Sequence, residues 1–282
     1  MDELFDRQAI ALHRERALKT GDRSAAFLLS RVAGEVADRL SLVDRQFDHA
    51  TVTSANVELL GDFLQGTRHE GLVCEACGIE DWTRNAEELP RGSGSDKDLA
   101  LSLLTLHETN DTPGALIHIR RRLKPDGLFM GVMPGAGTLQ ELRESWLSAE
   151  TELTGGAGPR VYPFADVRTA GDLLQRAGFA LPVIDTDSVV VRYSDMFALM
   201  RDLRAMGATN ALAARHRRFT RRDVMIRAAQ IYQERFADPD GKIPATFHFI
   251  FMSGWAPDAS QQKPAKRGSA TVSLAEALKS IK

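Results

Sequence analysis

Asp98 to Met133 read DLALSLLTLHETNDTPGALIHIRRRLKPDGLFMGVM, and this stretch decides the fold. Its first part, Leu99 to Leu106, is a nearly continuous apolar run, as expected for a strand buried on both faces of a parallel sheet. A helix should follow, because Thr112 can cap it and Pro113 at its first position loses no hydrogen bond. A Lys-Pro-Asp-Gly turn then leads into a second apolar strand, Leu128 to Met133. This order predicts a right-handed parallel crossover in an α/β sheet.

The part of the chain before this unit has a different character. It reads HATVTSANVELLGDFL from His49 to Leu64, with a strand expected over Ala50–Thr53 and a helix over Val57–Leu64. A second short strand is expected over Gly71–Cys77. The turn after a first strand is where glycines let the backbone approach a cofactor, yet the first glycine here is Gly61. The pattern therefore indicates a cofactor-enzyme scaffold without the usual cofactor loop.

The remaining elements complete one α/β domain, expected over residues 1–257. Its other helices are predicted over 24–40, 138–153, 169–177, 194–206 and 220–236. Strand material is expected over Phe179–Tyr193 and a last strand over Thr246–Trp255, whose alternating aromatic residues fit a sheet edge or an antiparallel partner. This arrangement makes residues 1–45 an N-terminal helical segment and about 194–236 a helical insertion before the last strand. Residues 85–98 are expected to form a loop, and 258–282 a flexible polar tail.

Composition excludes several classes of protein. A chain of 282 residues that is 43% hydrophobic can bury a sizeable core. A net charge of −2 argues against nucleic-acid binding, and there is no apolar run long enough to cross a membrane. Two cysteines indicate a reducing compartment, and the N-terminal residues have no apolar signal core, so a cytoplasmic location is expected.

Several stretches resemble a known family. Residues 102–129 look like the fourth and fifth strands of class I S-adenosylmethionine-dependent methyltransferases. Within that superfamily, three segments are similar to the branch that contains complex I assembly factor 5 and its bacterial relatives. They are GTLQELRESWLSAETELTGG (137–156), AGFALPVIDTDSVVVRYSDMFALMRDLRAMGATN (177–210) and DPDGKIPATFHFIFMSGW (238–255). The malonyl-carrier-protein methyltransferase of biotin synthesis is more distantly similar. The resemblance reaches about Pro257 and is weakest between Asp48 and Ser95.

This resemblance implies a fold and a class of function. The fold is a seven-stranded Rossmann-like sheet with helices on both faces and an antiparallel last strand. The cofactor is S-adenosylmethionine. The mitochondrial member of the branch is understood as a protein arginine hydroxylase that helps to assemble respiratory complex I. The resemblance thus implies methyltransferase or hydroxylase-type chemistry on a protein side chain or small acceptor, with a respiratory complex I subunit or another protein substrate as partner. A peripheral position at the inner membrane surface is then an alternative to a purely cytoplasmic location.

Candidate cofactor residues lie where the strands end, because ligands of open α/β sheets bind beyond the carboxyl ends of the strands. The predicted set consists of Thr53, Ser54, Ala55, Asn56, Glu75 and Leu106. Ser and Ala are small and Asn tolerates a positive φ, so the backbone can still approach a ligand. In the family an acidic residue after the second strand binds the ribose hydroxyls, and Glu75 is the candidate for that role. The alternative is an ordinary turn that has lost cofactor binding, with Glu75 as an exposed residue at a strand end.

Candidate catalytic residues follow the strand at 99–106. His107 can act as a general base or a proton shuttle, and Glu108 and Asp111 lie beside it in sequence. Family members more often carry an aromatic residue at the position of Glu108, so this pocket is more acidic than usual. Carboxylates suit a guanidinium substrate, because arginine prefers planar acceptors that take two hydrogen bonds. The alternative is a structural His107, with Asp111 and Thr112 serving only to cap a helix.

Two further features of the sequence have a functional and a structural interpretation. Cys74 and Cys77 have the spacing of a zinc half-site or a redox pair, but no second pair completes a tetrahedral site, so no metal is predicted. The basic segment from Arg215 to Arg222 can dock an acidic partner or a membrane surface, although such segments are more often solvated. Two functions therefore remain open, an enzyme of the assembly-factor type and a non-catalytic scaffold protein with a degenerate cofactor site.

Overall fold

The computed structural model describes residues 3–20, 23–76 and 97–262. The loop predicted from residue 85 and the tail predicted over 258–282 therefore lie mostly outside the described residues, as does Cys77. Residues 97 and 98, expected in that loop, belong instead to the strand that follows it.

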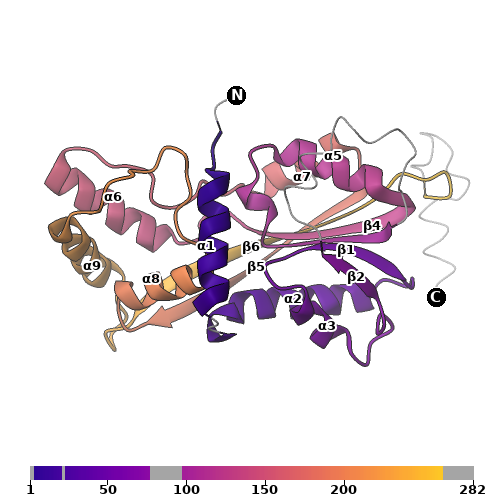
Figure 1. Ribbon diagram of the computed structural model, residues 1–282, viewed down its shortest axis with the longest axis horizontal. Helices are drawn as coiled ribbons and strands as arrows, with labels where there is room; N and C mark the ends of the chain where they lie inside the picture. Colours follow the sequence, from indigo (N-terminus) through magenta and orange to yellow (C-terminus); the bar gives the residue numbers. More distant parts are fainter. Residues whose placement is uncertain (1–2, 21–22, 77–96, 263–282) are drawn as a thin grey trace, which may run out of the picture.

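The described residues form one mixed sheet of six strands in the order β2-β1-β3-β4-β6-β5 (Figure 1). The strands are β1 (His49–Thr53), β2 (Val73–Ala76), β3 (Lys97–Leu103), β4 (Leu123–Pro134), β5 (Ala180–Tyr193) and β6 (Ile243–Trp255). The first four run parallel to one another, and β6 runs antiparallel to both of its neighbours. The predicted α/β class and antiparallel last strand are confirmed. The seventh strand implied by the family is not among the described residues.

Helices cover both faces of this sheet, as predicted (Figure 1). They are α1 (Arg7–Thr20), α2 (Phe27–Ser41), α3 (Glu58–Leu64), α5 (Thr112–Arg122), α6 (Gln140–Thr154), α7 (Val167–Ala177), α8 (Met196–Ala205) and α9 (Arg222–Phe236). One core cluster joins the sheet to α2, α3, α6, α8 and α9, and a second joins the opposite face to α5 and α7. Helices α8 and α9 form the predicted insertion between β5 and β6.

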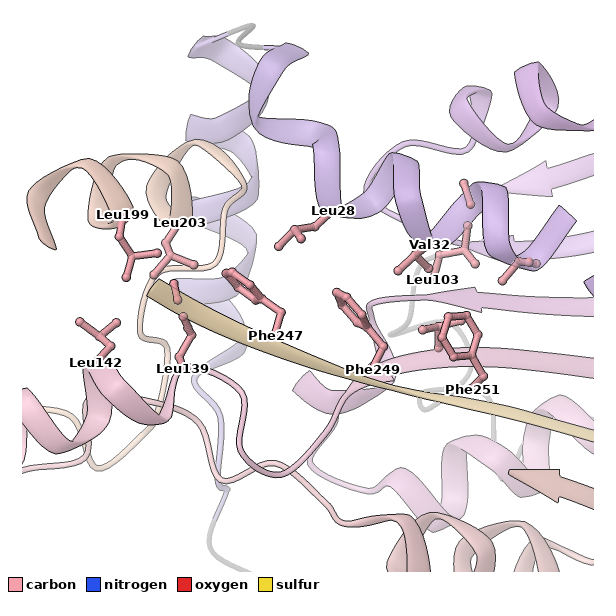
Figure 2. Packing of buried hydrophobic residues seen from close by; sticks show 14 of the residues in the cluster. Leu28, Val32, Leu103, Leu139, Leu142, Leu199, Leu203, Phe247, Phe249 and Phe251 are labelled. Atoms are coloured by element: carbon pink, nitrogen blue, oxygen red, sulfur yellow. The ribbon is translucent and has the colours of Figure 1, made fainter. Parts of the chain in front are cut away.

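The interior position of β6 explains its run of aromatic residues. Successive side chains of a strand point to opposite faces, so Phe247, Phe249 and Phe251 share one face. Figure 2 shows these three rings beside Leu28 and Val32 of α2. The strand lies between β4 and β5, so the antiparallel alternative is confirmed and the sheet-edge alternative is wrong.

Two predicted strand boundaries are wrong: the end of β3 and the start of β4. The strand expected over Leu99–Leu106 ends at Leu103, because Leu104 takes a left-handed φ of 53° and Leu106–Glu108 form a short 3-10 turn, η2. The second strand starts earlier than Leu128, since Leu123 already pairs with Lys97. Within the described residues, no helix is both long enough and apolar enough to cross a membrane.

Candidate functional site

A cavity of about 510 Å³ opens where β1, β3 and β4 end. Its volume lies in the range of small-molecule and side-chain pockets. From the strand ends it is lined by Ser54, Ala55, Asn56, Leu103, Leu104, His107, Glu108 and Pro134. The other walls come from α1, from α2 and the turn before it, from the start of α6, from Phe247 and Phe249 of β6, from residues 160–164 and from residues 203–210. The carboxyl ends of the parallel strands thus form the floor of the cavity, as expected for an α/β sheet.

The turn after β1 reaches the cavity but is closed on itself. Ser54 Oγ donates to the carbonyl of Asn56 at 3.0 Å and accepts from the Asn56 amide at 3.2 Å. Thr53 is buried behind this turn, where its hydroxyl bonds that of Thr105 at 2.9 Å and ties β1 to the end of β3. The predicted residues Ser54, Ala55 and Asn56 therefore line the site, whereas Thr53 supports the turn.

Two other predicted cofactor residues lie away from the cavity. The Glu75 carboxylate pairs with Lys97 at 2.6 Å and its side chain is 64% exposed. Leu106 is fully buried in the core cluster formed with α5. Neither residue lines the cavity. Their roles in cofactor binding stay predictions.

These residues fit S-adenosylmethionine in volume but not in chemistry. The cavity is large enough for such a ligand. In the described part of the chain, however, the turn at 54–56 carries three side chains instead of glycines, and its Ser54 hydroxyl and Asn56 amide already bond each other. The one acidic residue predicted for the ribose is paired elsewhere. The described residues thus do not provide the usual cofactor cradle, and no chemical step is derived through this cofactor.

His107 lines the cavity with a partly exposed side chain, but its Nδ1 atom is buried. Its Nδ1 has no hydrogen-bond partner among the described residues, and its ring centroid lies 6.1 Å from that of Tyr162 and 6.0 Å from that of Phe164. Burial lowers the pKa of His107, so the imidazole is neutral near pH 7. A buried polar atom without a partner costs free energy, and a ligand that bonds it would remove that cost.

Glu108 is the acidic residue among those that line the cavity. Its side chain is 8% exposed, and its Oε2 accepts a hydrogen bond from Arg14 Nη2 at 2.5 Å. The hydroxyl of Tyr162 lies 3.5 Å from Glu108 Oε1, but it donates to the carbonyl of Thr209 at the shorter distance of 3.2 Å. Burial, and then the nearby Glu108 charge, raise the pKa of Tyr162, so this phenol stays protonated.

Asp111 caps a helix outside the cavity. Its Oδ1 accepts from the Gly114 amide at 2.8 Å, which makes Asp111 the N-cap of α5. The prediction that Thr112 is the cap is therefore wrong, since Thr112 is the first residue of the helix and its hydroxyl bonds that of Thr109 at 2.7 Å. The geometry brings His107 and Glu108 together and leaves Asp111 apart.

Sequence reasoning missed Arg14 as a site residue. Arg14 lies 94 positions from Glu108, and no local pattern on α1 signals the contact. The only hint was the unusual acidity after β3, since a buried carboxylate needs a cation. Of the two cysteines, Cys74 is described; burial raises the pKa of its thiol. No group of three metal-ligating side chains exists in the described ranges.

The chain is similar in sequence to proteins of the same name from several organisms. The chain is 49% identical over 179 residues to the mitochondrial arginine-hydroxylase NDUFAF5 of Danio rerio, covering 64% of this chain and 56% of that protein. It is 40% identical over 262 residues to the protein of the same name in Homo sapiens, covering 89% of this chain and 76% of that protein. A malonyl-[acyl-carrier protein] O-methyltransferase of Laribacter hongkongensis is 36% identical over 177 residues, covering 63% of this chain and 57% of that enzyme.

Two other comparisons add less. No family model matches the chain. Among solved structures, one from Bacillus halodurans assigned as a methyltransferase is 12% identical, with a TM-score of 0.46, and covers 80% of this chain and 99% of its own.

Proposed function

The chain belongs to the family of the mitochondrial arginine-hydroxylase NDUFAF5, and from that membership we propose that it is an assembly factor for respiratory complex I. In this proposal the cavity receives an arginine side chain of a partner protein. The proposal is supported by one observation: the turn at 54–56, His107 and Glu108 all line the same cavity at the strand ends. The chain spans 56% of the zebrafish relative and 76% of the human one. That it shares the activity of those longer proteins is therefore part of the proposal.

The lining of the cavity suits a guanidinium group. Glu108 offers a carboxylate that is nearly shielded from water, where a charge-assisted hydrogen bond is strong. The rings of His107, Tyr162 and Phe164 lie within about 6 Å of one another, with centroids 6.0 to 6.2 Å apart. Aromatic faces of this kind attract cations, and arginine more often than lysine.

Loss of the protein tests its role in assembly. A host strain that lacks it should contain less assembled respiratory complex I on native gels, and the wild-type gene should restore the amount. The variant Glu108→Gln should restore it poorly, because the neutral amide removes the charge that recognises arginine. Normal assembly without the protein would reject the proposal.

Hydroxylation of the bound arginine is the second candidate, and it is the activity in the names of the relatives. The reaction inserts one oxygen atom of dioxygen into a C–H bond and reduces the other to water, so it needs a two-electron reductant that the described residues do not supply. His107, whose buried Nδ1 has no partner in the described structure, can exchange a proton with the bound group. Mass spectrometry of the partner protein should then show one added oxygen atom on an arginine. An unmodified arginine in fully assembled complex I would reject hydroxylation and support a non-catalytic scaffold function.

S-adenosylmethionine separates these two candidates in a second way. Saturable binding in a calorimetric titration would support an enzyme that keeps the family cofactor. No heat of binding at millimolar concentration is the result expected from the closed turn at Ser54 to Asn56. That result would favour the scaffold protein.

For location we propose peripheral binding at the inner membrane surface through residues 215–222. Phe219 is fully exposed, and Arg217 and Arg218 are exposed beside it. Basic residues around an exposed aromatic ring favour the interface of an anionic membrane. The protein should co-sediment with vesicles that contain cardiolipin and not with phosphatidylcholine vesicles, and Phe219→Ser should weaken the binding. Equal sedimentation with both vesicles would contradict the proposal.

A further inference from the structure

Helix α1 places a cation of this same chain inside the cavity. Arg14, Ala17 and Leu18 all line it, so the helix forms one wall. Arg14 Nη2 lies 2.5 Å from Glu108 Oε2, although the two residues are 94 positions apart in sequence. The carboxylate that would receive the partner's arginine therefore already holds a guanidinium.

The two members of this pair differ in their access to water. The Arg14 side chain is 31% exposed, whereas that of Glu108 is 8% exposed. Arg14 can therefore leave the pair and be solvated, but Glu108 cannot, and a buried carboxylate without a cation is strongly disfavoured. Among the described ion pairs, Arg14 is the partner of Glu108, and the other cavity cation, Arg160, pairs with Glu150.

Helix α1 is anchored firmly at its beginning. The Phe5 amide donates to Asn110 Oδ1 at 2.7 Å, and Asn110 Nδ2 donates back to the Phe5 carbonyl at 3.0 Å. Asp6 pairs with Arg215 at 2.8 Å. These contacts fix Phe5 and Asp6, which precede the helix, and do not involve residues of the helix itself.

The rest of α1 buries little apolar surface, although Arg14 and Ala17 pack closely on Gly207. Ala9 is the one buried residue of the helix, while Leu12 and Leu18 are 43% and 72% exposed. Beyond the anchor, its polar contacts with the cavity wall are the Arg14 pair and a hydrogen bond between His13 Nδ1 and the Thr209 carbonyl at 3.2 Å. A helix with so little buried apolar surface can move away from the wall at low cost.

We propose that Arg14 is a resident pseudosubstrate, whose guanidinium occupies the Glu108 subsite until an arginine of the partner protein displaces it. This inference rests on the proposed function of the cavity. The exchange replaces one guanidinium by another at the same carboxylate, so the Glu108 charge is not left uncompensated. Arg14 also lowers the apparent affinity for arginine, because only molecules with a vacant subsite can bind.

Removal of Arg14 tests this inference in the full chain. The ligand is N-acetyl-L-arginine amide, measured by calorimetry, with the uncharged citrulline analogue for comparison. Arg14→Ala should bind the arginine compound about tenfold more tightly than the wild type, the factor expected if Arg14 fills the subsite in nine molecules of ten. The citrulline analogue should gain nothing, which separates a freed charge from a merely larger cavity.

Two further variants make the result specific. Arg16→Ala changes an exposed arginine of the same helix that does not line the cavity, so its affinity should equal that of the wild type. Arg14→Ala combined with Glu108→Gln should lose the arginine affinity. If Arg14→Ala does not fold, as judged by circular dichroism, Arg14→Gln serves in its place and should show the same direction of change.

The outcomes distinguish the inference from the function on which it rests. Equal or weaker arginine binding by Arg14→Ala, with binding still dependent on Glu108, would overturn the pseudosubstrate role and keep the arginine site. No arginine binding by the wild type, Arg14→Ala or Arg14→Gln would overturn the arginine site itself, and the inference with it.

Discussion

The units β1–α3–β2 and β3–α5–β4 share the order strand, helix, parallel strand, but they differ in burial. Six of the seven residues of β3 are buried, whereas β2 has four residues and none of them is buried. Helix α5 has 11 residues and a side-chain cap, while α3 has 7 residues and none at its N-cap position. The difference follows from position, since β3 lies inside the sheet and β2 is the last described strand on its side. The interior unit defines the fold, and the turn in the outer unit can change without loss of the core.

The largest expected effect is the loss of a core side chain in the interior unit. Leu101 of β3 is 0% exposed, whereas Val73 of β2 is 57% exposed. Leu101→Ala should lower the free energy of unfolding by about 2–5 kcal/mol, because it leaves a cavity between packed layers. Val73→Ala should change it by less than about 0.5 kcal/mol. Urea unfolding measures both, and similar losses would show that the two units contribute equally to the core.

The strand ends differ in their response to pH. Strand β3 is followed by His107, whose pKa is lowered by burial, whereas residues 54–56 after β1 contain no titratable side chain. As the pH falls, the unfolded chain therefore binds a proton at this histidine before the folded chain does. The stability that neutral His107 contributes is complete above the unfolded pKa, near about 6.5, and decreases below it, by at most about 1.4 kcal/mol per pH unit.

The variant His107→Asn checks this dependence. Its free energy of unfolding, measured between pH 7.5 and 5, should fall less steeply than that of the wild type. His13 and His118 also have lowered pKa values, chiefly through burial, but both are present in each protein and cancel in the difference. Parallel pH curves would show that the pKa of His107 is the same in the folded and the unfolded protein.

Much of the interior unit could be predicted because its signals are local. An apolar run, a capping residue and a Pro-Asp-Gly turn are visible within 36 residues. The end of β3 was not visible, because the left-handed φ of Leu104 is uncommon for leucine and leaves no mark in the sequence. Neither was the choice of Asp111 over Thr112 as the cap, since both residue types cap helices well.

The site was predictable only in part, for a related reason. His107 and Glu108 were found because ligands bind at strand ends, which is a rule about the chain near one strand. Arg14 was not, because its contact depends on where α1 is placed by Phe5, Asp6 and Asn110. A contact that spans 94 residues is a property of the tertiary structure.

Loss of a helix cap in the interior unit should have a moderate effect. Asp111→Ala removes the 2.8 Å hydrogen bond to the Gly114 amide. It should lower the free energy of unfolding by about 1 kcal/mol, the usual value for such a cap, as measured in urea. Asp111→Asn can keep the acceptor and should stay near the wild type. A loss of arginine binding in Asp111→Ala would instead support the catalytic role predicted for this residue.

The smallest effect is expected for the equivalent change in the outer unit. Asn56 Oδ1 accepts from the Leu59 amide at 3.4 Å, a long hydrogen bond at an exposed position. Asn56→Ala should therefore cost no more than about 0.5 kcal/mol in the urea experiment, less than Asp111→Ala. It should also leave arginine binding unchanged, because Glu108 and not this turn provides the charge. A cost above that of Asp111→Ala would mean that the turn after β1 stabilises its unit as much as the cap of α5 does. The altered turn would then be a structural element in its own right, and not a part of the sheet that is free to vary.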